Sequence, residues 1–272
     1  MRYHPLCLGV GCATMRGMTR FAFFGDLHFG YERRAGRKVP LHDMAAFGAL
    51  FAFLEDFKPH HLILGGDILD CAAISHHNKG KPGRTEGMRL LADAEECHAA
   101  IIKPLAALGA RTTTYITGNH EDWLNDLTDE TPGLEGMMEL PRLLTLPKTW
   151  KVLPQGAHHS LGKLTFLHGD QLSGGEHVAK AAVIAYERSV RFLHFHTFQA
   201  FTKTSALDLR LGRTGMAVPC LCTKDQKYGE GKANRWVQGF NFGYLHDNGT
   251  YNDFVPIITE GATAIHGKVY RG

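Results

Sequence analysis

Two short apolar runs of this chain each end in glycine followed by aspartate. The run RFAFF at 20–24 leads into a glycine and Asp26, and the run HLIL at 61–64 leads into two glycines and Asp67. Aspartate is a poor strand former, and its burial without a partner costs free energy. Two aspartates at the ends of apolar strands therefore need partners for their carboxylates, which favours a fold that gathers both at one site.

Helical segments separate these two runs and a third strand. Apolar residues recur at helical spacing over 40–57, where Pro59 stops the helix, and 86–108 forms a second helical segment. The β-branched and aromatic run RTTTYIT at 111–117 predicts a third strand. Strands that alternate with helices indicate βαβ units with parallel strands.

The later part of the chain adds strands at 163–167 and 190–193, with a helix over 173–188 between them. We find no internal repeat and no low-complexity linker. The chain is therefore predicted to form one α/β domain over 19–272, a layered αββα sandwich of two mixed sheets flanked by helices. Residues 1–18 are expected to be a loose N-terminal tail.

Composition limits the possible functions. A net charge of +3 over 272 residues is too mild to indicate a nucleic-acid-binding protein by itself. The six cysteines show neither a CxxC pair nor the spacing of a disulfide framework, so we expect a reducing, cytoplasmic location. No apolar run approaches the roughly 18 residues of a membrane span, so we expect no membrane partner.

Each predicted strand of the α/β part is followed by side chains that offer oxygen or nitrogen. In chain order these are Asp26 and His28, Asp67, Asn119 and His120, His168, and His194 and His196. Ligands of open α/β sheets bind at this carboxyl edge of the strands. Oxygen and nitrogen donors together suit Mn, Fe or Zn, whereas too few sulfur atoms are present for a structural zinc site.

The segments GDLHFG, GGDILD, GNHED, LHGD and LHFHT, in this order, resemble the five motifs of the calcineurin-like metallophosphoesterases. One such motif alone is weak, but five in order, each after a strand, are specific. The resemblance implies a phosphoester hydrolase domain over 19–272 whose dinuclear site activates a bridging hydroxide. Its cofactors would be two divalent metal ions, Mn, Fe or Zn, with Mn favoured.

The resemblance also implies a role for each motif residue. The first ion would be bound by Asp26, His28 and His196, and the second by Asn119, His168 and His194, with Asp67 bridging both. Two cations about 3.5–4 Å apart can clamp a phosphoryl group during in-line displacement. His120 would remain free of metal as a catalytic residue that faces the substrate phosphate.

The chain departs from the family pattern at two places. Leu193 stands where the last motif usually has glycine, and its bulk could misplace His194. An alternative register aligns FHTF at 195–198 with that motif and leaves one ion a ligand short, so we favour the register that keeps both histidines. Cys71 follows the second motif where Ser/Thr protein phosphatases begin an Arg-Gly pair, which argues against a phosphoprotein phosphatase.

Basic residues follow the second motif directly. Lys79, Lys81 and Arg84 lie in SHHNKGKPGRTEGMR at 75–89, which is either a solvated loop or a rim that binds phosphates beyond the scissile one. The second interpretation favours a phosphodiesterase or nuclease whose substrate is a nucleic acid or nucleotide. A phosphomonoesterase for a small substrate and a catalytically degenerate binding protein remain alternatives. The sequence indicates no oligomeric state.

Overall fold

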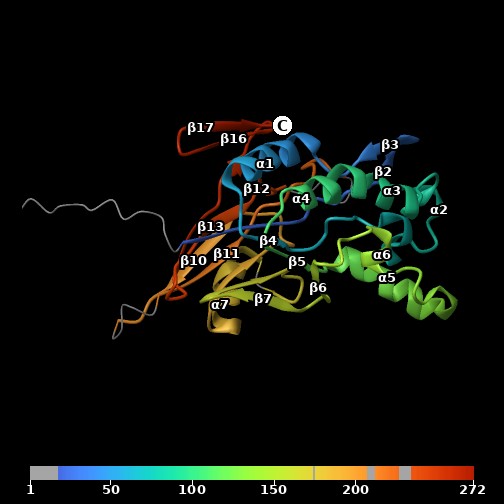
Figure 1. The fold of residues 1–272 in the computed structure, drawn as a ribbon. Helices are drawn as coiled ribbons and strands as arrows, with labels where there is room; N and C mark the ends of the chain where they lie inside the picture. The colour runs from blue at the N-terminus through green and yellow to red at the C-terminus, as the bar shows by residue number, and fades with distance from the viewer. Residues whose placement is uncertain (1–17, 174, 207–211, 227–233) are drawn as a thin grey trace, which may run out of the picture.

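The computed structural model describes residues 18–173, 175–206, 212–226 and 234–272 (Figure 1). Apart from Met18, the predicted N-terminal tail lies outside the described residues. Two mixed sheets pack face to face and carry helices on their outer faces. The predicted α/β sandwich of αββα type is confirmed.

The first sheet has six strands in the order β14-β13-β1-β4-β5-β6. Their bounds are β1 (Thr19–Phe24), β4 (His61–Leu64), β5 (Thr112–Ile116), β6 (Lys151–Leu153), β13 (Asn241–Leu245) and β14 (Tyr251–Phe254). β1, β4, β5 and β6 pair in parallel, as the βαβ pattern predicts, whereas β13 and β14 pair antiparallel.

The second sheet has five strands in the order β10-β11-β9-β8-β7. Their bounds are β7 (His158–Leu161), β8 (Leu164–Leu167), β9 (Ser189–Phe192), β10 (Gln199–Lys203) and β11 (Arg213–Ala217). β8, β9 and β11 are parallel to one another, and the two edge strands are antiparallel.

β1 shows why its sequence is apolar at successive positions. Phe21 and Phe23 point into the layer between the two sheets, where they meet Phe166 of β8. Ala22 and Phe24 point to the other face and pack under the helices. Successive side chains of a strand alternate between faces, so a strand that is covered on both faces must be apolar throughout.

The helices cover the outer faces of both sheets. α1 (Met44–Phe57), α3 (Leu90–Cys97) and α4 (Lys103–Ala107) lie over the first sheet, and α7 (Val178–Tyr186) lies over the second (Figure 1). The carboxylate of Asp43 caps α1 by accepting hydrogen bonds of 3.0 Å from the amides of Ala45 and Ala46. α1 ends where Lys58 takes a left-handed conformation, directly before Pro59.

Two predicted helices differ from those observed, and one observed helix was not predicted. The segment 86–108 is divided into α3, a π-helical turn η3 (His98–Ile102) and α4. The helix expected over 173–188 is shorter, because a 3-10 turn precedes α7. α5 (Asn119–Glu130) was not predicted, and it begins within the third motif.

Short elements complete the described residues. They are β2 (Tyr31–Arg34), β3 (Arg37–Pro40), η1 (Ala72–Ile74), η2 (His76–Asn78), α2 (Pro82–Thr85), η4 (Pro132–Leu134), α6 (Leu140–Leu143), η5 (Gly175–His177), β12 (Gln238–Gly239), β15 (Ile257–Ile258), β16 (Ala262–Ile265) and β17 (Lys268–Arg271). Within the described ranges, no helix has the length and apolar character needed to cross a membrane.

Candidate metal centre

The loops after β1 and β4 run side by side, because these strands are parallel neighbours. The amide of Asp26 donates to the carbonyl of Gly66 at 3.0 Å, and the amide of His28 donates to the carbonyl of Asp67 at 2.8 Å. In the second sheet, the amide of Leu193 donates to the carbonyl of His168 at 2.7 Å. The carboxyl ends of these four strands and of β5 thus bring the predicted residues to one edge of the sandwich.

The backbone turns sharply at these strand ends. Five of the seven predicted ligands have φ between 47° and 71°, namely Asp26, His28, Asp67, His194 and His196. Asn, Asp and His are the residues other than glycine that tolerate this left-handed region best. The residue types that offer metal ligands are therefore also compatible with the backbone that the site requires.

One group of side chains contains the residues predicted for the second ion. Nε2 of His168 lies 3.0 Å from Oδ1 of Asn119 and 3.3 Å from Oδ2 of Asp67. Nδ1 of His194 lies 2.9 Å from the same Asn119 oxygen. Nδ1 of His168 lies 2.8 Å from the carbonyl of Gly65, which leaves Nε2 as its ligand atom.

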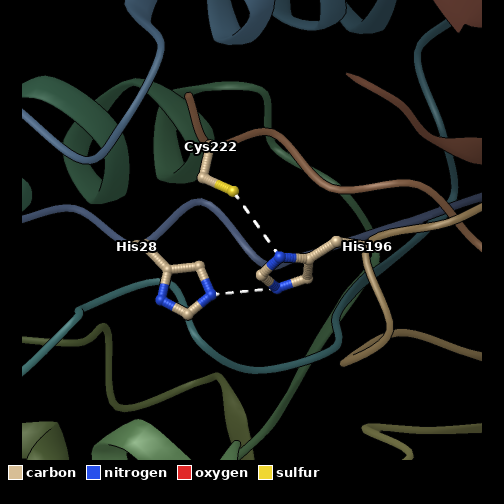
Figure 2. Close-up of side chains that lie close together, drawn as sticks. All are labelled: His28, His196 and Cys222. Atoms are coloured by element: carbon tan, nitrogen blue, oxygen red, sulfur yellow. Dashed lines mark hydrogen bonds between the residues drawn. The ribbon is translucent and has the colours of Figure 1, made fainter. Parts of the chain in front are cut away.

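A second group contains the residues predicted for the first ion. Nε2 of His28 lies 3.2 Å from Nε2 of His196 and 3.8 Å from Oδ2 of Asp67. Nε2 of His196 lies 3.5 Å from Oδ2 of Asp26. Figure 2 shows His196 between His28 and Cys222, with one ring nitrogen facing each of them. The structure brings all seven predicted ligands together, and Asp67 lies between the two groups.

These side chains fit divalent cations. Oδ1 of Asp26 is buried and has no hydrogen-bond partner, although an unpaired buried carboxylate oxygen is costly. Burial is the largest influence on this carboxyl and raises its pKa to about 7. A cation would satisfy the free oxygen, and the oxygen and imidazole donors around it are those that Mn, Fe and Zn accept.

The histidines of the centre differ in protonation. Burial opposes the charged form of His168, but the carboxylates of Asp67 and Asp26 outweigh it and raise its pKa to about 10. Burial and the charge of His168 lower the pKa of His194 to about 4. Burial and the charge of His28 also lower the pKa of His196. His194 and His196 are therefore neutral at pH 7 and can bind a metal without losing a proton.

Comparison with known proteins decides the family. The sequence model of the calcineurin-like phosphoesterase family matches residues 19–201, which is well over half of the chain. The chain belongs to this family. The matched range contains all seven candidate ligands of this calcineurin-like chain, and it ends before Cys222. No curated protein sequence matches the chain significantly.

Solved structures with a similar course of the chain include two named proteins. Vps29 of Chaetomium thermophilum is 13% identical, with 88% of this chain and 97% of that chain covered and a TM-score of 0.39. A dimetal phosphatase from Danio rerio is 10% identical, with 85% and 94% covered and a TM-score of 0.40.

His120 lies beside both groups in this calcineurin-like site. Its Nδ1 is 3.0 Å from Oδ1 of Asp70 and 3.0 Å from the Asp70 carbonyl, which leaves Nε2 for a substrate. Burial opposes its charge, but Asp67 and Asp70 outweigh this effect and raise the pKa of His120 to about 9. In the metal-free protein these carboxylates therefore favour the protonated form of His120. Asp70 also accepts from Nδ1 of His28 at 2.8 Å, so one carboxylate orients two rings.

Sequence reasoning missed Glu121, which fixes the loop that carries Asp67. One oxygen of this buried carboxylate accepts from the amides of Asp67 (2.9 Å) and Gly118 (2.8 Å), and the other accepts from the amides of Ile68 and Leu69. The hydroxyl of Tyr115 also donates to it. The only sequence signal was a charged residue within the segment GNHED, and nothing in that segment indicates the partners of Glu121 around Asp67.

Leu193 does not displace its neighbour His194. The side chain of Leu193 is fully buried between the sheets, in space that Gly25 and Gly65 leave open. A Cβ at Gly25 would lie 2.6 Å from Cδ1 of Leu193, and one at Gly65 would overlap the same atom. The two glycines after the strands thus make room for the leucine, while His194 turns the other way toward Asn119.

A cleft of about 1030 Å³ opens over the metal centre. Its walls include the candidate ligands His28, Asp67, Asn119, His194 and His196, together with His120, Trp123, Trp236, Arg33, Lys81 and Arg84. Two of the three predicted substrate-binding residues therefore line it. Lys79 does not, because its ammonium is paired with Glu130 at 2.7 Å beside a separate, smaller cavity. The roles of Lys79, Lys81 and Arg84 in substrate binding remain predictions.

Proposed function

We propose that this family member hydrolyses phosphoesters with two divalent metal ions, Mn being favoured over Fe and Zn. The observation that carries the proposal is the place of Asp67, whose Oδ2 lies 3.3 Å from His168 and 3.8 Å from His28. A carboxylate offers two oxygens and so suits a bridge between two cations. When bound, the ions supply Lewis-acid stabilisation of the phosphoryl group and activation of water.

The side chains of the chain would divide the remaining tasks. Asp26, His28 and His196 would hold the first ion, and Asn119, His168 and His194 the second. His120 would donate a proton to the leaving-group oxygen, because its raised pKa keeps it protonated at neutral pH. Asp70 would keep the other nitrogen of His120 away from the substrate.

We further propose a phosphodiester substrate such as a nucleic acid or nucleotide. The cleft is much larger than a single phosphate needs, and Lys81 and Arg84 on its wall can bind a second phosphate. Trp236 also lines it, is half-buried and offers an aromatic face to a base, whereas Trp123 is buried against His120. The four described cysteines Cys71, Cys97, Cys220 and Cys222 are free, which supports the expected cytoplasmic location.

The proposal is tested by elemental analysis together with hydrolysis in the presence of Mn²⁺. Bis(p-nitrophenyl) phosphate, p-nitrophenyl phosphate and a single-stranded oligonucleotide serve as diester, monoester and nucleic-acid substrates. We expect two ions per chain and faster cleavage of the diesters. Faster monoester cleavage would replace the diester proposal with the phosphomonoesterase alternative. One ion or none, with no turnover of any substrate, would favour the degenerate binding protein, for which Leu193 was the only sequence feature.

A further inference from the structure

A buried thiol lies next to the metal centre although it comes from a segment beyond the family match. The amide of Leu221 donates to the carbonyl of Asp26 at 3.1 Å, which holds the segment against the first motif. The side-chain amide of Gln238 donates to the carbonyl of Cys222 at 2.9 Å. The backbone on both sides of the thiol is therefore fixed by the fold.

Cys222, His196 and His28 form a compact set of ligand atoms (Figure 2). Sγ of Cys222 lies 3.9 Å from Nδ1 of His196, and the ligand atoms of the three residues all lie within 4.8 Å of one another. All three residues are buried. In a tetrahedral zinc site, sulfur and nitrogen ligands lie about 3.5 Å apart, so the three side chains must approach one another when an ion binds.

We propose that Cys222, His196 and His28 form a separate site for one thiophilic divalent ion such as Zn²⁺, Cd²⁺ or Co²⁺. The cysteine sulfur forms a bond to the ion while the thiol proton passes to the buffer, and no oxidation is involved. Thiolate and imidazole are ligands that select these ions over Mn²⁺. His196 contributes Nδ1 here, whereas its Nε2 faces Asp26.

This thiol site and the first position of the dinuclear centre exclude one another. Nδ1 of His28 is occupied by Asp70 at 2.8 Å, so only Nε2 of His28 can bind an ion. That single nitrogen cannot serve both positions. A thiophilic ion at Cys222 therefore withdraws His28 from the first position. On the proposed function, on which only this consequence depends, such an ion inhibits hydrolysis.

The binding claim is tested by titrating the metal-free protein with Co²⁺ and recording the thiolate-to-cobalt charge-transfer band in the near ultraviolet. The variants are Cys222→Ser and, as a matched control, Cys220→Ser, which removes a buried thiol from the same segment. We expect the band in the wild type and in Cys220→Ser and its loss in Cys222→Ser. A wild type without the band, or a band that persists in Cys222→Ser, overturns the site.

A second measurement needs the wild type alone, so it does not depend on the folding of a variant. Saturating Mn²⁺ should lower the apparent affinity for Co²⁺ read from the same band, because both ions require Nε2 of His28. An affinity unchanged by Mn²⁺ overturns the shared use of the histidine. If no preparation hydrolyses any phosphoester, the proposed function fails, while the charge-transfer band still decides the thiol site.

Discussion

Two buried polar clusters of this chain differ in how completely their hydrogen bonds are satisfied. The guanidinium of Arg191 is fully buried, and each of its five N–H groups donates to a nearby oxygen. The acceptors are both carboxylate oxygens of Asp253, the carbonyl and hydroxyl of Thr214 and the carbonyl of Val190. This cluster is closed and leaves its cation no group with which to bind a ligand.

The metal centre, in contrast, contains polar atoms whose hydrogen bonds are not satisfied. Oδ1 of Asp26 has no hydrogen-bond partner, and Nε2 of His28 lies 3.2 Å from Nε2 of His196, another nitrogen. The pKa of Asp26 is raised to about 7 and that of His168 to about 10, so neighbouring groups compete for protons. The comparison teaches that burial of charge alone does not identify a site. Donor atoms that converge without partners do.

The largest effect should come from Asp67→Asn, because the amide removes the negative charge shared by both groups. We expect metal content to fall from two ions to at most one and phosphodiester hydrolysis to fall by at least about 10³-fold. Elemental analysis and initial rates in Mn²⁺ provide the measurement. A folded Asp67→Asn protein with two ions and unchanged rates would break the comparison, since the shared carboxylate would then contribute neither to ion binding nor to hydrolysis.

His120→Asn should lower hydrolysis by about 10²–10⁴-fold while both ions stay bound, because His120 supplies a proton rather than a ligand. The loss should be smaller for a p-nitrophenyl leaving group, which departs without a proton, than for an alkyl leaving group. Rates for both kinds of diester provide the measurement. Loss of metal, or equal losses for both leaving groups, would contradict the assigned role.

Asp253→Asn should act on stability alone. It leaves the buried Arg191 cation without its counter-charge, and breaking such a pair costs about 3–5 kcal/mol of unfolding free energy. Chemical denaturation measures the loss, and metal content should not change. Asp56→Asn is the matched control, because its ion pair with Lys268 is half exposed and its loss should have a much smaller effect. Reduced metal content in Asp253→Asn would mean that the two clusters are not independent.

Metal uptake should depend on pH through His168 rather than His194. Below a pKa of about 10, His168 of the metal-free protein carries a proton that a metal must displace, whereas His194, with a pKa of about 4, carries none at neutral pH. Binding at pH 8 should therefore release protons, and affinity should rise about tenfold per pH unit for each proton released. Calorimetry in buffers of different ionisation enthalpy counts the protons. Zero release would show that His168 is not a ligand.

The smallest effect should come from the basic wall of the cleft. Lys81→Ala and Arg84→Ala should each raise KM for an oligonucleotide by about fivefold, which corresponds to about 1 kcal/mol for one exposed charge. A small diester should be affected less. Lys79→Ala is the matched control, because Lys79 is paired with Glu130 outside the cleft. Equal effects of all three variants would point to general electrostatic attraction instead of a defined wall.

Sequence reasoning succeeded where one strand or one motif determined the outcome. The order of the parallel strands and the gathering of their terminal residues follow from alternating strands and helices, and the structure places Asp26, Asp67 and His168 at one edge. Their role as ligands remains a prediction. The sequence spacing could not predict which lysine lines the cleft, because Lys79 and Lys81 are only two residues apart in an irregular segment.

Long-range partners were the other gap. Glu121 and Asp70 act through backbone amides and rings that are about fifty and forty to fifty residues away in the chain, respectively. No local pattern encodes such contacts. The helix α5 was missed because the segment NHED was interpreted only as a source of ligands. Its first turn also contacts the loop after β4, where the amide of His120 donates to Asp67.

The central place of β1 affects how the molecule is made. β1 lies between β4 and β13, and β13 comes from the last part of the chain. During synthesis on the ribosome, β1 therefore lacks one neighbour until residues 241–245 have emerged. A nascent chain that has reached residue 201 already contains all seven candidate ligands, but it lacks both this strand and the amide of Leu221 that supports Asp26. The backbone support of Asp26 is thus complete only after residue 221 and strand β13 have been synthesised.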